Sequence, residues 1–210
     1  MLMTNLLKFA FALFLIVPFS SINGQIRPKY VIGLNLSTLS IKTRDLSSAP
    51  KTPAGIHFGV SYEIPLIDNF TLRTGLLFSA KGADYKIDTV AVSISPIYIE
   101  IPLNAVYNFG SDELKISLFA GPYFAAGIWG YKLESGMEFR YISFGSGEHN
   151  DLKAFDFGFN FGTGVKIRDL LVSAQYGIGL ANISPVTTDE SKMTNKVIGV
   201  SISSSFPGKK

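Results

Sequence analysis

The sequence has no cysteine, little charge and no long apolar run beyond its first 24 residues. The lack of cysteine excludes disulfides, thiolate metal sites, cysteine nucleophiles and lipid attachment through an N-terminal cysteine. Charged residues make up 17% of the chain, against roughly 25% in soluble domains. No later stretch approaches the roughly 18 uninterrupted apolar residues of a transmembrane helix. The net charge of +3 gives no reason to expect a nucleic acid as partner.

The first residues have the layout of a secretory signal peptide. Lys8 precedes an apolar run from Phe9 to Val17, and small or polar residues follow up to Gly24. This order of charge, apolar run and small residues is typical of a cleaved signal. We therefore expect residues 1–24 to be a signal peptide and residues 25–210 to form one domain. The alternative for the apolar run is a short buried helix.

Most of the remaining sequence alternates between apolar and polar or small residues. A period of two places alternate side chains on opposite faces of a β-strand. In the segment 154–166, for example, phenylalanines alternate with Asp156, Gly158 and Asn160. The same alternation predicts eight strands, at residues 29–37, 55–64, 70–81, 96–109, 114–130, 154–166, 170–182 and 196–206.

The two faces of the predicted strands differ in composition, and the difference indicates that one face meets lipid. The apolar faces are rich in Phe, Ile, Leu and Tyr and are expected to carry no charge, whereas the opposite faces carry the charges and many glycines. A charge that faces lipid at mid-bilayer costs about 2–4 kcal/mol, so lipid exposure explains this exclusion. Strands in lipid must close on themselves to pair their backbone groups. The predicted fold is all-β: an eight-stranded antiparallel up-and-down transmembrane β-barrel. A secreted soluble barrel with a ligand cavity is the alternative.

The predicted links alternate in length. Short links at 65–69, 110–113 and 167–169 alternate with long ones at about 38–54, 82–95, 131–153 and 183–195. Bacterial barrels have short periplasmic turns and longer external loops, so we expect both termini in the periplasm and four long loops outside. Five tyrosine and tryptophan residues near the strand ends predict aromatic girdles: Tyr30, Tyr62, Tyr107, Trp129 and Tyr131. Strict alternation, however, assigns Tyr98 and Trp129 to the inward face.

Five short motifs, in order, resemble the PorT-like outer-membrane β-barrel family over the mature chain. They are the strand that ends in Lys81-Gly82, the "YIEIPL" strand at 98–103, the "AGPY" stretch at 120–123, Asp156-Phe157-Gly158, and the segment 174–183, in which Gln175 stands where the family often has Arg. The resemblance implies an outer-membrane barrel but no specific activity. A role in protein secretion, known for the family's named member, would be an analogy.

Inward polar residues and external loops are the two places where function could lie. Arg73 and Glu100, on neighbouring predicted strands, are expected to form an ion pair. They belong to six residues that are predicted to form a structural polar network in the lumen: Glu63, Arg73, Glu100, Asn104, Asp156 and Gln175. Eight strands leave no open channel, so we expect function at the loops. The expected role is structural or interactive, with membrane lipid and envelope proteins as partners. No catalytic residue, cofactor, metal or small-molecule substrate is predicted; a membrane-embedded enzyme and a part of a secretion machinery are the alternatives.

Overall fold

The computed structural model describes residues 28–42, 46–87, 89–111, 113–134, 139–147, 149–185 and 192–205. The predicted signal peptide lies outside the described residues. The main strands are β1 (Pro28–Lys42), β3 (Ala54–Ile67), β4 (Phe70–Ala80), β6 (Val90–Gly110), β7 (Leu114–Glu134), β9 (Phe155–Ile167), β10 (Leu170–Gly179) and β11 (Lys192–Ser205). Three shorter strands are β2 (Leu46–Lys51), β5 (Ala83–Ile87) and β8 (Arg140–Tyr141). No helix within these ranges is long and apolar enough to cross a membrane.

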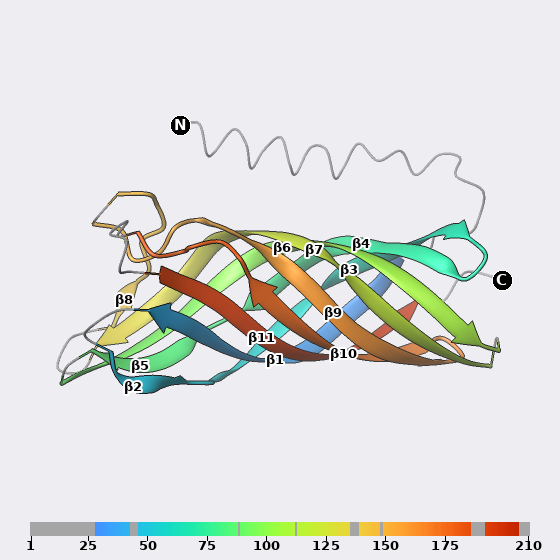
Figure 1. Cartoon of the computed structure of the whole chain (residues 1–210), viewed down its shortest axis with the longest axis horizontal. Coiled ribbons are helices and arrows are strands. Elements are labelled where there is room, and N and C mark those ends of the chain that lie inside the picture. The colour runs from blue at the N-terminus through green and yellow to red at the C-terminus, as the bar shows by residue number, and fades with distance from the viewer. Residues whose placement is uncertain are drawn as a thin grey trace.

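The eight main strands form a closed ring. Each pairs antiparallel with the next along the chain, and the β1–β11 pair closes the ring. Figure 1 shows the strands tilted along one elongated barrel. Closure leaves no unpaired edge in the ring, which a strand in lipid requires. The prediction of an eight-stranded antiparallel up-and-down barrel is confirmed.

The ends of the barrel differ because the links alternate in length, as predicted. Tight turns join β3 to β4, β6 to β7 and β9 to β10 at what we call the short-turn end. Asp68, Gly110 and Arg168 in these turns have positive φ angles of 28°, 108° and 56°. The other links form the long-loop end, on the left of Figure 1, where β2, β5 and β8 lie. These three strands were not predicted, because the long links were expected to be loops.

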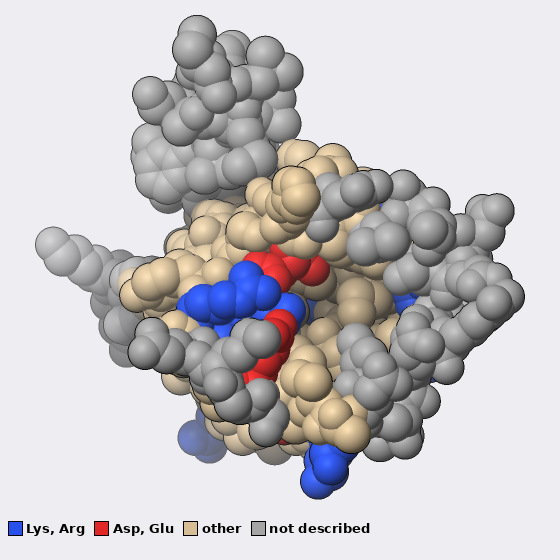
Figure 2. Space-filling view, turned by 90° about the vertical axis from the view of Figure 1, so that its left-hand side faces the viewer, with Lys and Arg blue, Asp and Glu red and all other residues tan. Residues whose placement is uncertain are grey.

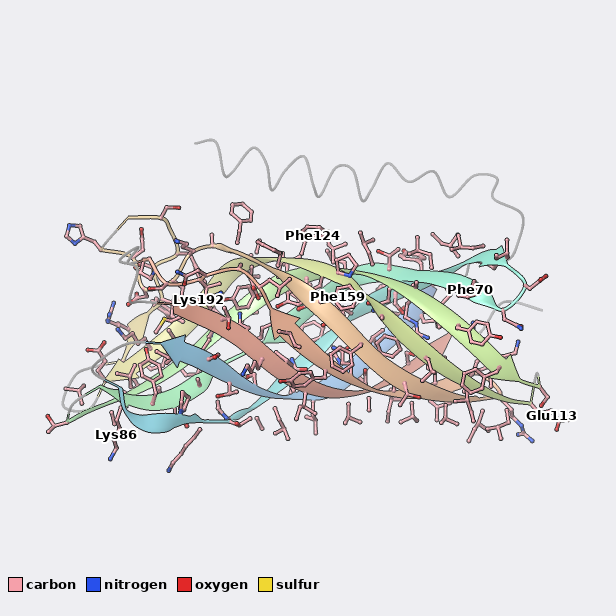
Figure 3. The ribbon with its side chains drawn as sticks, viewed as in Figure 1. Phe70, Lys86, Glu113, Phe124, Phe159 and Lys192 are labelled. Carbon is pink, nitrogen blue, oxygen red and sulfur yellow. The ribbon has the colours of Figure 1, made fainter. Side chains whose placement is uncertain are left out.

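The outer wall is apolar, as the alternation predicts. Phe155, Phe157, Phe159 and Phe161 on β9 are exposed, whereas Asp156 between them is 2% exposed. Figure 3 shows side chains projecting from the wall, with the labelled phenylalanines along the barrel and Lys86, Lys192 and Glu113 toward its ends. The expected absence of charge from the outward faces is wrong at one place. Lys192 and Lys196 share the outward register positions of β11 with Ile198 and Val200.

A β-bulge corrects the predicted orientation of Trp129. In the β6–β7 pair, Ile97 faces Trp129 but Tyr98 faces Gly127, so Ile128 is an extra residue on β7. The extra residue reverses the alternation beyond it. Trp129 therefore points outward and is 51% exposed, while Tyr98 points inward and is fully buried. The girdle position predicted for Trp129 fits this geometry, and its inward assignment was wrong.

The aromatic side chains give the height of the lipid-facing band. Trp129 faces Ile97, which is about 10 residues from Tyr107 along β6. At about 3.4 Å per residue and a tilt of about 40°, these levels are roughly 26 Å apart. Tyr107 packs on Phe70 at the short-turn end, and Trp129 packs on Tyr141 at the long-loop end. The spacing matches the roughly 25 Å apolar band of an outer-membrane barrel.

Beyond this band, the long-loop end contains its own apolar core. The residues of this loop-end core come from the extended strands and from the links, and all are buried: Leu39, Ala83, Tyr85, Val92, Ile94, Ile142, Leu152, Ala181 and Ile183. Backbone hydrogen bonds tie the links together, from Ile142 N to Gly130 O (3.0 Å) and from Lys153 N to Ile183 O (2.9 Å). The need to bury these apolar side chains explains why part of the long links is ordered into strands and packed segments.

Candidate functional site

The lumen is filled with side chains, because inward rings lie against glycines of neighbouring strands. A Cβ atom on Gly158 would lie 2.6 Å from the Tyr123 ring, and one on Gly162 would lie 2.6 Å from the Phe119 ring. The rings of His57 and Phe144 take the corresponding spaces at Gly33 and Gly127. The glycines at 158 and 162 therefore make room for rings in a narrow lumen.

The six residues predicted for the lumen network all project inward, but they lie in separate groups. Glu100, Asn104 and Asp156 are buried, while Glu63, Arg73 and Gln175 are half-buried. Glu63 and Arg73 lie toward the short-turn end, whereas Glu100 and Asp156 lie closer to the long-loop end. Their role as a site remains a prediction.

The predicted ion pair between Arg73 and Glu100 is wrong. In the β4–β6 register Arg73 faces Asn104, and Glu100 faces Leu77. Four residues of strand, about 13 Å, therefore separate the two levels. Period-two patterning predicts the face of a residue but not its partner in the next strand.

Arg73 instead pairs with Glu63, its direct neighbour across the β3–β4 pair. Its Nη2 lies 3.0 Å from Glu63 Oε1, and Lys29 Nζ contacts the other carboxylate oxygen. The Arg73 guanidinium also lies over the Phe119 ring, 5.2 Å from its centroid. Lys29 was not among the predicted residues, although it shares the inward parity of Asn35 on β1.

Lys81 is the centre of the second group and was also missed. Its Nζ lies 2.9 Å from Glu100 Oε2 and 3.3 Å from Asp156 Oδ2. It is 3% exposed and lies over the rings of Tyr98 and Tyr123, at 5.0 and 4.5 Å from their centroids. An ammonium between two carboxylates and two π faces is held by charge pairing and cation–π attraction. We call these five residues the Lys81 cluster.

Further polar groups complete the Lys81 cluster. Tyr123 Oη donates to Asp156 Oδ2 at 3.1 Å, and Asn195 Nδ2 donates to the same oxygen at 2.8 Å. His57 Nδ1 contacts Asn35 Oδ1 at 2.8 Å nearby in the lumen. Lys81 lies directly after β4, the other members of the cluster come from β6, β7 and β9, and Asn195 links the cluster to β11. The Lys81 ammonium is thus paired with carboxylates from two other strands across the lumen.

A third charged group lies at the long-loop end and involves β7, β8 and the link to β9. Arg140 binds Asp151 through two hydrogen bonds of 3.1 and 2.8 Å, and Lys132 binds both Glu134 and Asp151. Ser143 N donates to Asp151 Oδ2 at 3.0 Å. Figure 2 shows basic and acidic side chains next to one another on this end of the molecule. We call Lys132, Glu134, Arg140 and Asp151 the loop ion cluster.

The loop ion cluster lies beyond the lipid-facing band, and its carboxylates are stabilised in the charged form. The hydrogen bond from Lys132 holds the pKa of Glu134 below its usual range. For Asp151, burial acts to raise the pKa, but hydrogen bonds from Ser143 and the charges of Lys132 and Arg140 outweigh it and lower the pKa. Within the described ranges no group of His, Asp and Glu is arranged to hold a metal ion.

Comparison with known proteins adds a family match. A family model described as an outer membrane protein beta-barrel domain matches residues 23–184. No match was found among curated proteins. Neisserial surface protein A is 12% identical, with 85% of this chain and 97% of that chain covered and a TM-score of 0.45. Ail, the attachment invasion locus protein of Yersinia pestis, is 12% identical, covering 85% and 98%, with a TM-score of 0.41. OprG from Pseudomonas aeruginosa is 10% identical, covering 89% and 100%, with a TM-score of 0.42.

Proposed function

Because the chain belongs to the outer membrane protein beta-barrel domain family, we propose that it is a non-conducting scaffold whose long-loop end binds partners of the cell envelope. The observation that carries the proposal is the packed long-loop end. The loop-end core packs residues from the long links together there, and the loop ion cluster holds the longest link in place. A rigid scaffold with ordered loops is the common arrangement for binding.

The proposal includes an orientation of the barrel in the outer membrane. In our proposal residues 1–24 direct export and are removed, and the short-turn end with both termini lies in the periplasm. The alternation of link lengths supports this arrangement. We further propose that the barrel is PorT-like and not an enzyme, since three of its lumen acids are paired with bases: Glu100 and Asp156 with Lys81, and Glu63 with Arg73 and Lys29. N-terminal sequencing of the protein from outer membranes tests the first point and is expected to begin at Gln25.

Site-specific photo-crosslinking in cells tests the binding role. A photoreactive amino acid at Ser146 or His149 would occupy an exposed position on the longest link, and Ser111, exposed in a short turn, provides the control. We expect discrete cross-linked products from positions 146 and 149 that are absent at position 111. The proposal is wrong if the long-loop positions give no product or the same products as Ser111. Hydrolysis of lipid or peptide that a single Ser or His substitution abolishes would instead establish the enzyme alternative.

A further inference from the structure

The outward faces of the ring strands carry charge at one place only among the described residues. Their outward positions are otherwise apolar or uncharged, from Phe155 to Ile167 on β9 and along the other strands. The exceptions are Lys192 and Lys196, at the long-loop end of the β1–β11 pair. They lie on the same outward face of β11 as the exposed Ile198 and Val200, nearer to the long-loop end. Lys42 is the Cα partner of Lys192. All the charge on these outward faces is thus of one sign and on one seam.

Lys196 is flanked by apolar residues of the lipid-facing wall. Its Cα partner on β10 is Ile178, and the next outward residue of that chain segment, Leu180, is 56% exposed. On the other side its Cα partner is Thr38. A lysine in this position lays its apolar stem along the wall and extends its ammonium group toward the headgroups. The penalty for a lipid-facing lysine falls from about 2–4 kcal/mol at the midplane to about 0–1 kcal/mol near the interface.

No carboxylate of the described residues lies on the outward face that carries Lys192 and Lys196. The ring strands place no Asp or Glu at an outward position within the described ranges, and the acids of the loop ion cluster pair with Lys132 and Arg140. At about 13 Å apart along the strand, the ammonium groups of Lys192 and Lys196 repel each other only weakly, and an anion that both approach is attracted by the two charges together. The anion that is present at this depth is the phosphate of a lipid headgroup.

We propose that Lys192 and Lys196 form a binding site for a lipid headgroup with an exposed phosphate at the long-loop end of the β1–β11 seam. The two side chains stand on the same face, about 13 Å apart along the strand, and their flexible stems allow both to approach one headgroup. The acyl chains then lie against Ile198, Val200 and Ile202, which continue the same face toward the short-turn end. Figure 3 labels Lys192 at this end of the barrel. The site belongs to the lipid-facing wall and does not depend on the binding role of the loops.

Native mass spectrometry of the full mature barrel tests the site, with phosphatidic acid and phosphatidylcholine as probes. Phosphatidic acid exposes a phosphate monoester, whereas choline screens the phosphate of phosphatidylcholine. We expect the wild-type protein to retain phosphatidic acid in preference to phosphatidylcholine. The K192Q/K196Q variant is expected to weaken this binding about 30-fold, from about 1 kcal/mol for each lysine near a membrane surface and 1.4 kcal/mol per tenfold change.

The matched control is K51Q/K86Q, which removes two exposed lysines from β2 and β5 at the same end. It should bind phosphatidic acid like wild type. Heat-modifiable gel migration shows that each variant is folded. The proposal is overturned if K192Q/K196Q binds like wild type or if both double variants lose binding equally. Displacement of the lipid by excess inorganic phosphate also overturns it, because the site would then recognise a free anion.

Discussion

Replacing Lys81 by methionine tests the structural role of the Lys81 cluster. The substitution keeps most of the side-chain volume but removes the ammonium that lies 2.9 Å from Glu100 and 3.3 Å from Asp156. Both carboxylates are almost completely buried, so they would lose their positive partner in a medium of low polarity. Breaking a buried ion pair by removing one partner costs about 3–5 kcal/mol. We expect the free energy of unfolding of K81M to fall by that amount.

The assay is urea unfolding in lipid vesicles, followed by the fluorescence of Trp129, the only tryptophan of the chain. Lys51→Met provides a control, because this lysine is exposed and surface substitutions usually change stability by less than about 0.5 kcal/mol. A triple variant, K81M/E100Q/D156N, removes all three charges and should recover at least about 2 kcal/mol, since neutralising a whole buried set is far less costly than breaking it. A loss below about 1 kcal/mol for K81M, or no recovery in the triple variant, would refute the reasoning.

Three further predictions concern the lumen, the loops and the wall. Gly158→Val places atoms against the Tyr123 ring and should destabilise the barrel by about 1–3 kcal/mol in the same urea assay, whereas Ala174→Val at an exposed outward position of β10 should be nearly neutral; equal effects would contradict a filled lumen. Because the pKa values of Glu134 and Asp151 are lowered, their stabilisation of the loop is complete above about pH 4.5, the ordinary range of these groups, and is lost as the pH falls through the lowered values. The hydrogen-exchange protection of residues 139–147 and 149–152, corrected for the pH dependence of intrinsic exchange, should therefore stay high down to about pH 4.5 and fall below it, and D151N should show low protection already at pH 7; protection independent of both changes would exclude the loop ion cluster as the cause of order. Lipids brominated near the headgroup should quench Trp129 more than lipids brominated near the chain ends, and no quenching by either would contradict its outward position.

The strands could be predicted because lipid imposes a strong and simple rule on sequence. The phenylalanines of β9 alternate with Asp156, Gly158 and Asn160, since one face meets acyl chains and the other a narrow polar lumen. The tight turns at Asp68 and Arg168 follow from the same spacing. Lys196 shows the limit of the rule, because the headgroup region accepts a lysine that the bilayer centre would exclude.

The contacts between strands could not be predicted from alternation. Register decides that Arg73 meets Glu63 and not Glu100, and register depends on the packing of both strands. One extra residue at Ile128 was enough to reverse Trp129. Lys29 and Lys81 lie at the ends of the predicted segments, where attention to parity with Asn35 and Arg73 would have assigned both to the lumen.

The order of the long-loop end also lay beyond sequence patterning. Tyr85, Ile142 and Ile183 come from three different links, and their shared core exists only after the ring has closed and brought the links together. Packing between distant segments of this kind leaves no periodic trace in the sequence.

Single-channel recording of the purified barrel in a planar lipid bilayer tests the closed lumen most directly. With the inward rings against their glycines and the loop-end core above them, the account predicts that insertion produces no stepwise increase in current at moderate voltage. Insertion should be verified in the same preparation by the heat-modifiable migration of the protein. Stable, reproducible conductance steps from the wild-type protein would contradict the account and place its function in the lumen.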